Sequence, residues 1–140
     1  MVIETAIVAP VLVLMSLGAF QISGIVARQT ELQSAAAEGA AIALASAPDT
    51  TAKQAVLKNV LMASTGLPAD KVSVGVRYRC DSAITLNTTA TSCNSGQVRS
   101  SYVRIQLNDT YTPSWTHFGV GRPITYQVKR YVMLKQERVS

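Results

Sequence analysis

Apolar residues dominate the first part of the chain, and charged residues are missing from it. No formal charge occurs between Glu4 and Arg28. At about 1.5 Å per helical residue this stretch reaches roughly 35 Å, which matches a bilayer core of about 30 Å. The pattern therefore predicts a transmembrane helix over residues 1–27, with the carboxylate of Glu4 at its head. A charge in lipid costs about 2.5 kcal/mol or more, so Glu4 either marks the aqueous edge of the helix or meets a cation.

The helical pattern continues past Arg28. Residues 35–45 are rich in alanine, which is the best helix former, and no proline occurs between Pro10 and Pro48. The sequence predicts one helix over residues 1–46, with an amphipathic second half outside the membrane. Pro10 lacks an amide donor, so we expect it to kink the helix or to leave the carbonyl of Ala6 unpaired.

Small residues recur four positions apart on this predicted helix and let neighbouring helices approach closely. One set lies in the apolar part and a second set beyond it: Ala19, Ser23 and Ala27, then Ala35, Gly39 and Ala43. Lipid or other subunits are the partners expected for residues 5–27. For residues 35–45, docking on the chain's own domain is expected at least as strongly as contact with another subunit.

Beyond Pro48 the period of the apolar positions indicates a second helix followed by three strands. The helix has Asp49 or Thr50 as its N-cap and ends at Gly66. Alternating apolar and polar residues predict strands at residues 72–80, about 101–110 and about 123–136. Three successive strands favour an antiparallel meander with the helices on one side. The predicted fold class is α+β, with residues 47–140 as one small globular domain.

The two cysteines, Cys80 and Cys93, close part of a polar loop at residues 81–100. An even pair in a chain with a membrane-crossing start predicts a disulfide formed in an oxidising compartment, and two free thiols are the alternative. Closing a loop of this length is worth roughly 3 kcal/mol. Two cysteines and the distant His117 do not have the spacing of a zinc ligand set, so no metal site is predicted.

Charge is distributed unevenly along the chain. Residues 71–140 carry 10 of the 13 basic side chains and 3 of the 8 acidic ones, so this half is strongly basic. Outward strand positions supply a candidate basic surface: Arg77, Arg79, Arg104 and Lys129. A solvated face is the first interpretation, and contact with nucleic acid, anionic polysaccharide or lipid headgroups is the second.

The sequence predicts neither an enzyme nor a cofactor. It has one histidine, and it shows no glycine-rich phosphate loop, no nucleophile elbow and no cluster of carboxylates. His117 lies between Trp115 and Phe118, where a packing or surface role is expected. The two aromatic residues are expected to join the edge of the core or to contact a neighbouring subunit.

Two segments resemble a known family. The stretch Val2–Pro10, with a glutamate in an apolar run and an alanine-proline step, followed by Val11–Leu14, resembles the start of TadE-like proteins. These are pilin-like or pseudopilin subunits of the tight-adherence (Tad, or Flp) type IV pilus systems. The segment Phe118–Thr125, which precedes the last predicted strand, is also similar to that family.

The resemblance implies a pilin-like fold and a structural role in adhesion or surface attachment. A prepilin peptidase is expected to remove a short basic leader, so the chain would be a trimmed mature form that leaves the inner membrane for an extracellular pilus. The helix of residues 1–27 would then form the filament core, and the globular domain would be periplasmic or extracellular.

Glu4 would pair with the N-terminal amine of a neighbouring pilin subunit in the filament, although this glutamate is usually fifth in the family and is fourth here. Major subunits of this class are usually much shorter, which favours a minor or tip subunit. The alternative is a single-pass, membrane-anchored assembly or binding factor that never enters a filament.

Overall fold

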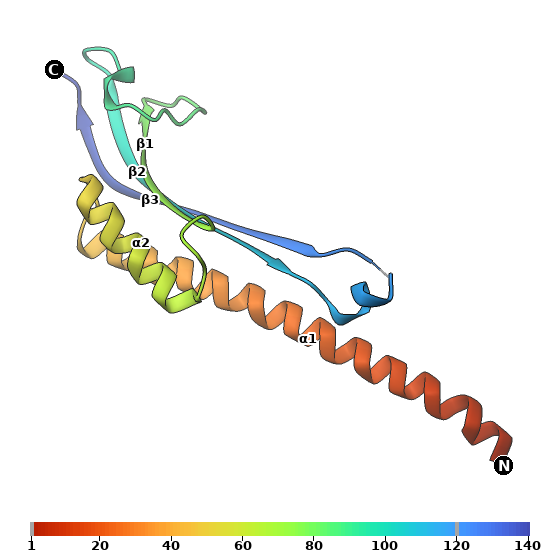
Figure 1. Cartoon of the computed structure of the whole chain (residues 1–140). Coiled ribbons are helices and arrows are strands. Elements are labelled where there is room, and N and C mark those ends of the chain that lie inside the picture. Colours follow the sequence, from red (N-terminus) through yellow and green to blue (C-terminus); the bar gives the residue numbers. More distant parts are fainter. Residues whose placement is uncertain (1, 120) are drawn as a thin grey trace.

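The computed structural model describes residues 2–119 and 121–140, without the side chains of residues 2–5, 92 and 118. Within these residues it has two helices, α1 (Val2–Ala45) and α2 (Thr51–Thr65), and a sheet of three strands, β1 (Val72–Cys80), β2 (Val98–Tyr111) and β3 (Ile124–Arg138). Two short 3-10 helices lie in the connections, η1 (Ala90–Ser92) and η2 (Ser114–Phe118). Both long helices lie on the same side of the sheet (Figure 1). The predicted α+β fold is confirmed.

The helix α1 is one continuous element of 44 residues, as its composition predicts. Pro10 is the proline inside it, and its missing amide leaves no donor for the Ala6 carbonyl. The helix ends just before Pro48, where proline and the turn residues around it no longer favour helical backbone. Residues 46–50 then connect it to α2.

The helix α2 has a conventional cap at each end. Thr50 is its N-cap, and the Thr50 hydroxyl accepts a hydrogen bond from the backbone N–H of Lys53 at 3.4 Å. Asp49, the other predicted cap, instead pairs with the Lys53 ammonium at 2.9 Å. At the C-terminus Gly66 takes a left-handed conformation with φ 68°, and its N–H donates to the Met62 carbonyl at 2.9 Å.

The sheet is an antiparallel meander in the order β1-β2-β3. Its strand β2 begins at Val98 rather than near residue 101, because the first residues of the strand are polar and hide the alternation. Asp81 stabilises the strand at Val98 through two hydrogen bonds. Its carboxylate accepts one from the Val98 N–H, and its own N–H donates one to the Val98 carbonyl, both at 2.7 Å. The strand β3 likewise extends to Arg138, beyond the predicted end.

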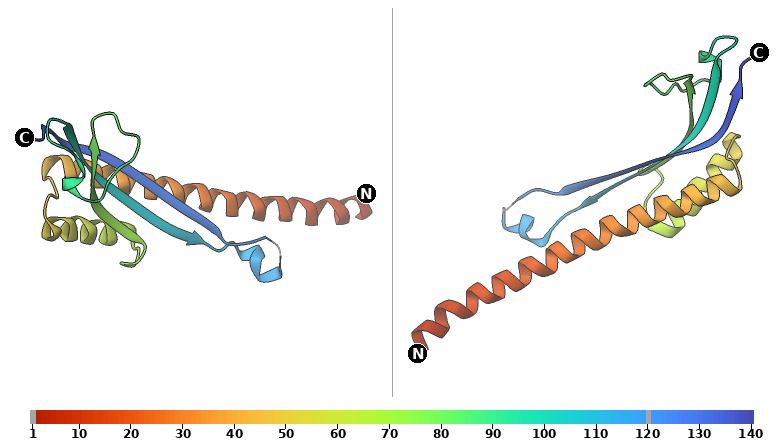
Figure 2. Two further views of the ribbon diagram at one scale, coloured as in Figure 1. Left: turned by 90° about the horizontal axis from the view of Figure 1, so that it is seen from above. Right: turned by 180° about the vertical axis from the view of Figure 1, so that it is seen from behind.

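The core lies between the helix pair and one face of the sheet (Figure 2). It is built from Val103, Ile105 and Leu107 of β2, which are fully buried, and from buried residues of both helices. The main contributors are Leu32, Ala36, Leu57, Leu61, Val72, Val103, Ile105 and Leu107. Burial of these apolar side chains is the principal favourable term in folding.

The β2–β3 hairpin is longer than the core needs. It extends along α1 past the end of α2, and its tip, which contains η2, comes near the apolar half of α1 (Figures 1 and 2). A hydrogen bond between Gln21 and Ser114 shows that the two segments touch there. The domain therefore covers more of α1 than its second half.

At the far end of the sheet the Glu137 carboxylate pairs with both Arg99 and Lys135. This arrangement gives a prediction for how the stability of the fold depends on pH. Hydrogen bonds and charge from Lys135, and then from Arg99, lower the pKa of Glu137 from its ordinary 4.5 to about 2. The Arg99 Nε donates to Glu137 Oε1 at 3.1 Å and links β2 to β3. Because the folded pKa is the lower one, this carboxylate stabilises the fold above about pH 4.5, and the contribution is lost as the pH falls toward 2.

We expect Glu137→Gln to flatten that part of the pH profile. The measurement is the urea midpoint of the full chain in detergent at several values between pH 6 and pH 2, followed by circular dichroism. Exposed Glu38 lies outside this cluster, and Glu38→Gln is the matched control. A Glu137→Gln variant that loses stability with acid as steeply as the unmodified chain would contradict the assignment.

Candidate assembly surface

The first half of α1 exposes its apolar side chains on all sides. Residues 6–17 are all exposed, with Leu14 at 69% and nearby Phe20 at 77%. In the described part of the chain α1 is the one helix long and apolar enough to cross a membrane. Its most apolar stretch of 18 residues has a mean hydropathy of 2.0, and none of that stretch is buried. An apolar surface of this extent is typical of contact with lipid or with other protein chains.

The second half of α1 docks on the chain's own domain through small residues. Ala35, Gly39 and Ala43 are all buried there. A Cβ added at Gly39 would lie 2.9 Å from Leu61 Cδ2 and 3.3 Å from Ile105 Cδ1. The sequence left two partners open for this set, the chain's own domain and another subunit. In the structure the set packs against the chain's own domain.

The other set of small residues faces away from the domain. Ala19, Ser23 and Ala27 are exposed, and at 3.6 residues per turn they lie roughly opposite the buried side of α1. The same row continues through further small exposed residues: Thr30, Ser34, Ala37 and Ala41. We call this set, from Ala19 to Ala41, the outer row. Thr30 satisfies its own hydroxyl by donating to the Val26 carbonyl at 2.9 Å, so it brings no unpaired donor to an apolar contact.

Arg28 joins three elements of the structure. Its Nε donates to Asp109 Oδ2 of β2 at 2.7 Å, its Nη1 to Glu31 Oε2 at 2.9 Å, and its Nη2 to the Thr65 carbonyl at the end of α2 at 3.1 Å. The Arg28 and Asp109 side chains are only 25% and 21% exposed, so this pair is poorly screened by solvent. The guanidinium thus fixes how the domain sits on α1.

A second polar contact fastens the hairpin tip nearer the N-terminus. The Tyr111 hydroxyl donates to Gln21 Oε1 at 2.9 Å, and the Gln21 amide donates to the Ser114 hydroxyl. The Tyr126 hydroxyl also donates to the Ile25 carbonyl, at 3.4 Å. Domain contacts therefore reach well into residues 1–27, the part of α1 that the sequence assigns to the membrane.

The sequence reasoning missed Arg28 and Gln21 as docking residues. A signal was present, because Gln21, Ile25, Arg28 and Leu32 follow one another at intervals of three or four along one helical face. Their partners in the β2–β3 hairpin, Asp109 for Arg28 and Tyr111 for Gln21, are more than 80 residues away in sequence, however, and only the three-dimensional structure identifies them.

Glu4 and Pro10 lie in the part of α1 beyond the domain. The backbone of Glu4 belongs to the first turns of the helix, and its side chain lies outside the described residues. A carboxylate near a helix N-terminus interacts favourably with the helix dipole. Pro10 is exposed. Pairing of Glu4 with a neighbouring chain stays a prediction.

The loop after β1 is closed by the predicted disulfide between Cys80 and Cys93. The loop is also held by a two-way backbone contact, in which Tyr78 donates to Asn87 at 2.9 Å and Asn87 donates to Tyr78 at 2.7 Å. No group of histidine, cysteine and acidic side chains suited to a metal ion occurs among the residues that the structure describes. His117 is exposed near the end of η2.

The candidate basic surface lies on the face of the sheet that points away from the helices. Arg77 is paired across the strands with Tyr102, and Arg104 with Tyr131, while Lys129 is exposed on β3. The Arg79 guanidinium stacks over the Tyr102 ring at 5.3 Å, a cation–π contact. No acidic partner of these four cations is found in the described part of the chain. Binding of nucleic acid or polysaccharide by this face stays a prediction.

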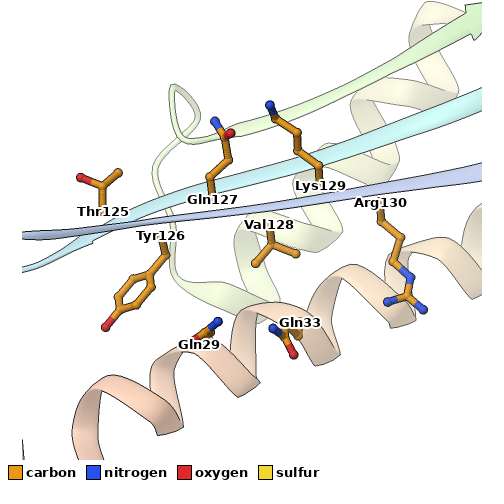
Figure 3. A pocket seen from close by; sticks show the side chains of 8 residues that line it. All are labelled: Gln29, Gln33, Thr125, Tyr126, Gln127, Val128, Lys129 and Arg130. Atoms are coloured by element: carbon orange, nitrogen blue, oxygen red, sulfur yellow. The ribbon is translucent and has the colours of Figure 1, made fainter. Parts of the chain in front are cut away.

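A polar groove of about 400 Å³ separates α1 from β3. Figure 3 shows Tyr126, Val128 and Arg130 pointing toward α1, where Gln29 and Gln33 face them, whereas Gln127 and Lys129 point away. The groove lining contains no carboxylate, thiol or imidazole.

Comparison with known families matches residues 1–41 to the model of the TadE-like protein family. The resemblance predicted from the N-terminal sequence is thus confirmed over this segment, whereas the one over Phe118–Thr125 lies outside it and stays a prediction. Comparison with curated proteins and with solved structures gives no match. The family match and the exposed apolar helix together indicate a protein associated with the Tad pilus.

Proposed function

We propose that this chain, which begins with a TadE-like segment, is a pilin-like structural subunit of a Tad type IV pilus, in a minor or tip position. The precursor is held in the inner membrane by α1 and then transferred to the filament, where α1 packs among the helices of other subunits. The observation that carries the proposal is the apolar first part of α1, where the described side chains of residues 6–17 are all exposed although the rest of the helix is docked on the domain.

The outer row suits helix packing after the domain has docked. Ala19, Ser23 and Ala27 leave a shallow surface on the side away from the sheet. Such a surface lets a second helix approach with its backbone close, where packing and weak contacts operate even without water to expel. One side of α1 thereby holds the subunit together, and the opposite side is available to neighbouring pilin subunits.

Glu4 is proposed to set the register between neighbouring subunits. Prepilin peptidase would expose a terminal amine, and the Glu4 carboxylate of one subunit would pair with the amine of the next. In an apolar bundle this pair is strongly favoured over either charge alone, because an unpaired buried charge is poorly solvated. The domain contributes surface contacts for adhesion and carries no chemistry of its own in this proposal.

The test is to shear filaments from cells that express the full-length protein and to collect them by centrifugation. Mass spectrometry of the filament and inner-membrane fractions then locates the chain and its N-terminus. We expect the chain in filaments, with a processed N-terminus a few residues from Glu4 at most. Recovery only from the inner membrane, with an unprocessed upstream segment, would support the anchored assembly factor and overturn the filament proposal.

A further inference from the structure

Cations and tyrosines lie side by side on the face of the sheet that points away from the helices. Six residues at outward positions of the three strands form what we call the basic face: Arg77, Arg79, Tyr102, Arg104, Lys129 and Tyr131. Tyr102 of the middle strand lies opposite Arg77 of β1. Arg104 of the same strand lies opposite Tyr131 of β3. Neighbouring strands are about 5 Å apart, so each of these cations lies next to a ring.

No acidic side chain balances the basic face. Outward positions of the described strands hold no aspartate or glutamate, and the two acids within the strands, Asp109 and Glu137, pair with cations outside this face. Arg79 Nε and Arg104 Nε are buried and have no hydrogen-bond acceptor among the residues that the structure describes. Because an unmet buried donor is costly, an anionic ligand that supplies acceptors is favoured here.

Gly75 leaves an opening in the middle of the basic face. It lies opposite Arg104 and two positions before Arg77 on its own strand. A Cβ added there would meet no atom within 4 Å, so the position borders open space and not a packed contact. Glycine inside a strand often marks a place where a ligand approaches the backbone closely. An anionic group placed over Gly75 is within side-chain reach of both Arg77 and Arg104.

Single-stranded nucleic acid is the polyanion that fits this arrangement. It repeats a phosphate and a flat base, and proteins bind it by combining cations along the backbone with aromatic rings on which bases stack. The Tyr131 ring is available, since this residue is 46% exposed. Arg79 lies over the Tyr102 ring, and bases stack on guanidinium planes as well as on rings. Three of the four cations are arginines, which bind phosphate through two parallel hydrogen bonds.

We propose that the basic face binds single-stranded nucleic acid without sequence preference. A phosphate lies over Gly75 between Arg77 and Arg104, and neighbouring bases stack on Tyr131 and on the Arg79 guanidinium. The contacts are to phosphates and to the flat surfaces of bases, so binding tolerates any sequence and weakens as salt is added.

The orientation of the basic face leaves it accessible in a filament. The strands run along α1 and the helices cover the opposite side of the sheet, so this face does not point toward the end of α1 that enters lipid (Figures 1 and 2). A subunit packed through the outer row of α1 turns the basic face away from the filament centre. This step rests on the proposed function, whereas binding by the subunit itself does not. Binding by a chain that is recovered only from membranes would keep the inference and overturn the filament proposal alone.

Fluorescence anisotropy of a labelled oligothymidylate measures binding to the full chain in a neutral detergent. We expect the logarithm of the affinity to fall with the logarithm of the salt concentration at a slope of about −3, the value for about four phosphate contacts on a single strand. An abasic strand of the same length keeps the phosphates and lacks the bases, so it should bind roughly tenfold more weakly. Equal affinity for the abasic strand or for a polyuronate would overturn the nucleic-acid assignment in favour of a general polyanion surface. Absence of binding at low salt would overturn the proposal as a whole.

Gly75→Thr tests the opening without disturbing a packed contact. Threonine suits a strand, so the urea midpoint should stay the same or rise, while the affinity falls by roughly tenfold as the side chain fills the space over the backbone. Full affinity in this variant would contradict the phosphate position.

Two arginine variants separate the basic face from net charge. Arg77→Ala should weaken binding and reduce the salt slope by about 0.7, the share of one phosphate contact. Arg130→Ala is the matched control, because Arg130 belongs to the same sheet but points toward α1 (Figure 3). Its affinity should stay within about twofold of the unmodified chain, since salt screens a charge that makes no contact with the strand. Equal losses in the two variants would show that net charge is responsible and would overturn the site.

Discussion

Replacing Gly39 with leucine is expected to lower the free energy of unfolding by about 3 kcal/mol, at the upper end of typical overpacking effects. Even a Cβ at this position would lie 2.9 Å from Leu61 Cδ2 and 3.3 Å from Ile105 Cδ1. Leu61 and Ile105 are 1% and 0% exposed, so either side chain could yield only by displacing its neighbours in the closely packed core. The change would separate α1 from both α2 and the sheet.

The matched control is Ala41→Leu on the same helix. Ala41 is an exposed member of the outer row, so in the isolated chain its replacement is expected to change stability by no more than about 0.5 kcal/mol. Urea unfolding of the full chain in detergent, followed by near-ultraviolet circular dichroism, measures both. Equal stability of the two variants would mean that α1 does not dock through Gly39.

The elements of this fold could be predicted from sequence because each has a local cause. A long uncharged apolar run, followed by an alanine-rich segment with no proline before Pro48, gives α1, and alternation around Val103 and Ile105 gives β2. The caps of α2 follow from Thr50 and Gly66, although the sequence alone did not separate Asp49 from Thr50. Local propensity and pattern agree with the global fold in each of these cases.

The docking side of α1 could not be predicted in the same way. Alanines occupy several sides of the helix between residues 35 and 45, so the apolar pattern there has no clear direction. The contacts that choose the direction come from residues far away in sequence, as in the Arg28–Asp109 pair and the Gln21–Ser114 hydrogen bond. The start of β2 also has no clear apolar direction. Arg99 and Ser100 point to opposite faces of the strand and both are polar, so the alternation that predicts a strand is missing there.

Docking on one side of α1 has a consequence for assembly. Arg28 and Gln21 hold the domain against one side of the helix, and the outer row is left on the opposite side. A neighbouring helix that contacts Ser23 therefore does not compete with the domain for the same surface. The fold of the subunit and its packing in a filament can thus be disturbed separately, which makes variants of the two kinds informative.

Replacing Glu4 with alanine is expected to reduce incorporation into filaments by about 100-fold while membrane insertion stays intact. Removing one partner from a buried ion pair is worth about 3–5 kcal/mol, because the other charge is left unpaired. At about 1.4 kcal/mol per tenfold change, the lower figure already gives about 100-fold. The apolar segment after Glu4 is unchanged, so α1 should enter the membrane as before.

The measurement is the ratio of the chain in sheared filaments to the chain in inner membranes, by quantitative mass spectrometry. Glu4→Gln keeps the size and polarity of the side chain and removes the charge, so it should behave like Glu4→Ala if pairing with an amine is the cause. Glu38 is an exposed carboxylate on the same helix, outside the apolar segment, and Glu38→Ala should assemble normally. If Glu4→Ala enters filaments as well as the unmodified chain, charge pairing is not what sets the register, and the contacts of the outer row must do so alone.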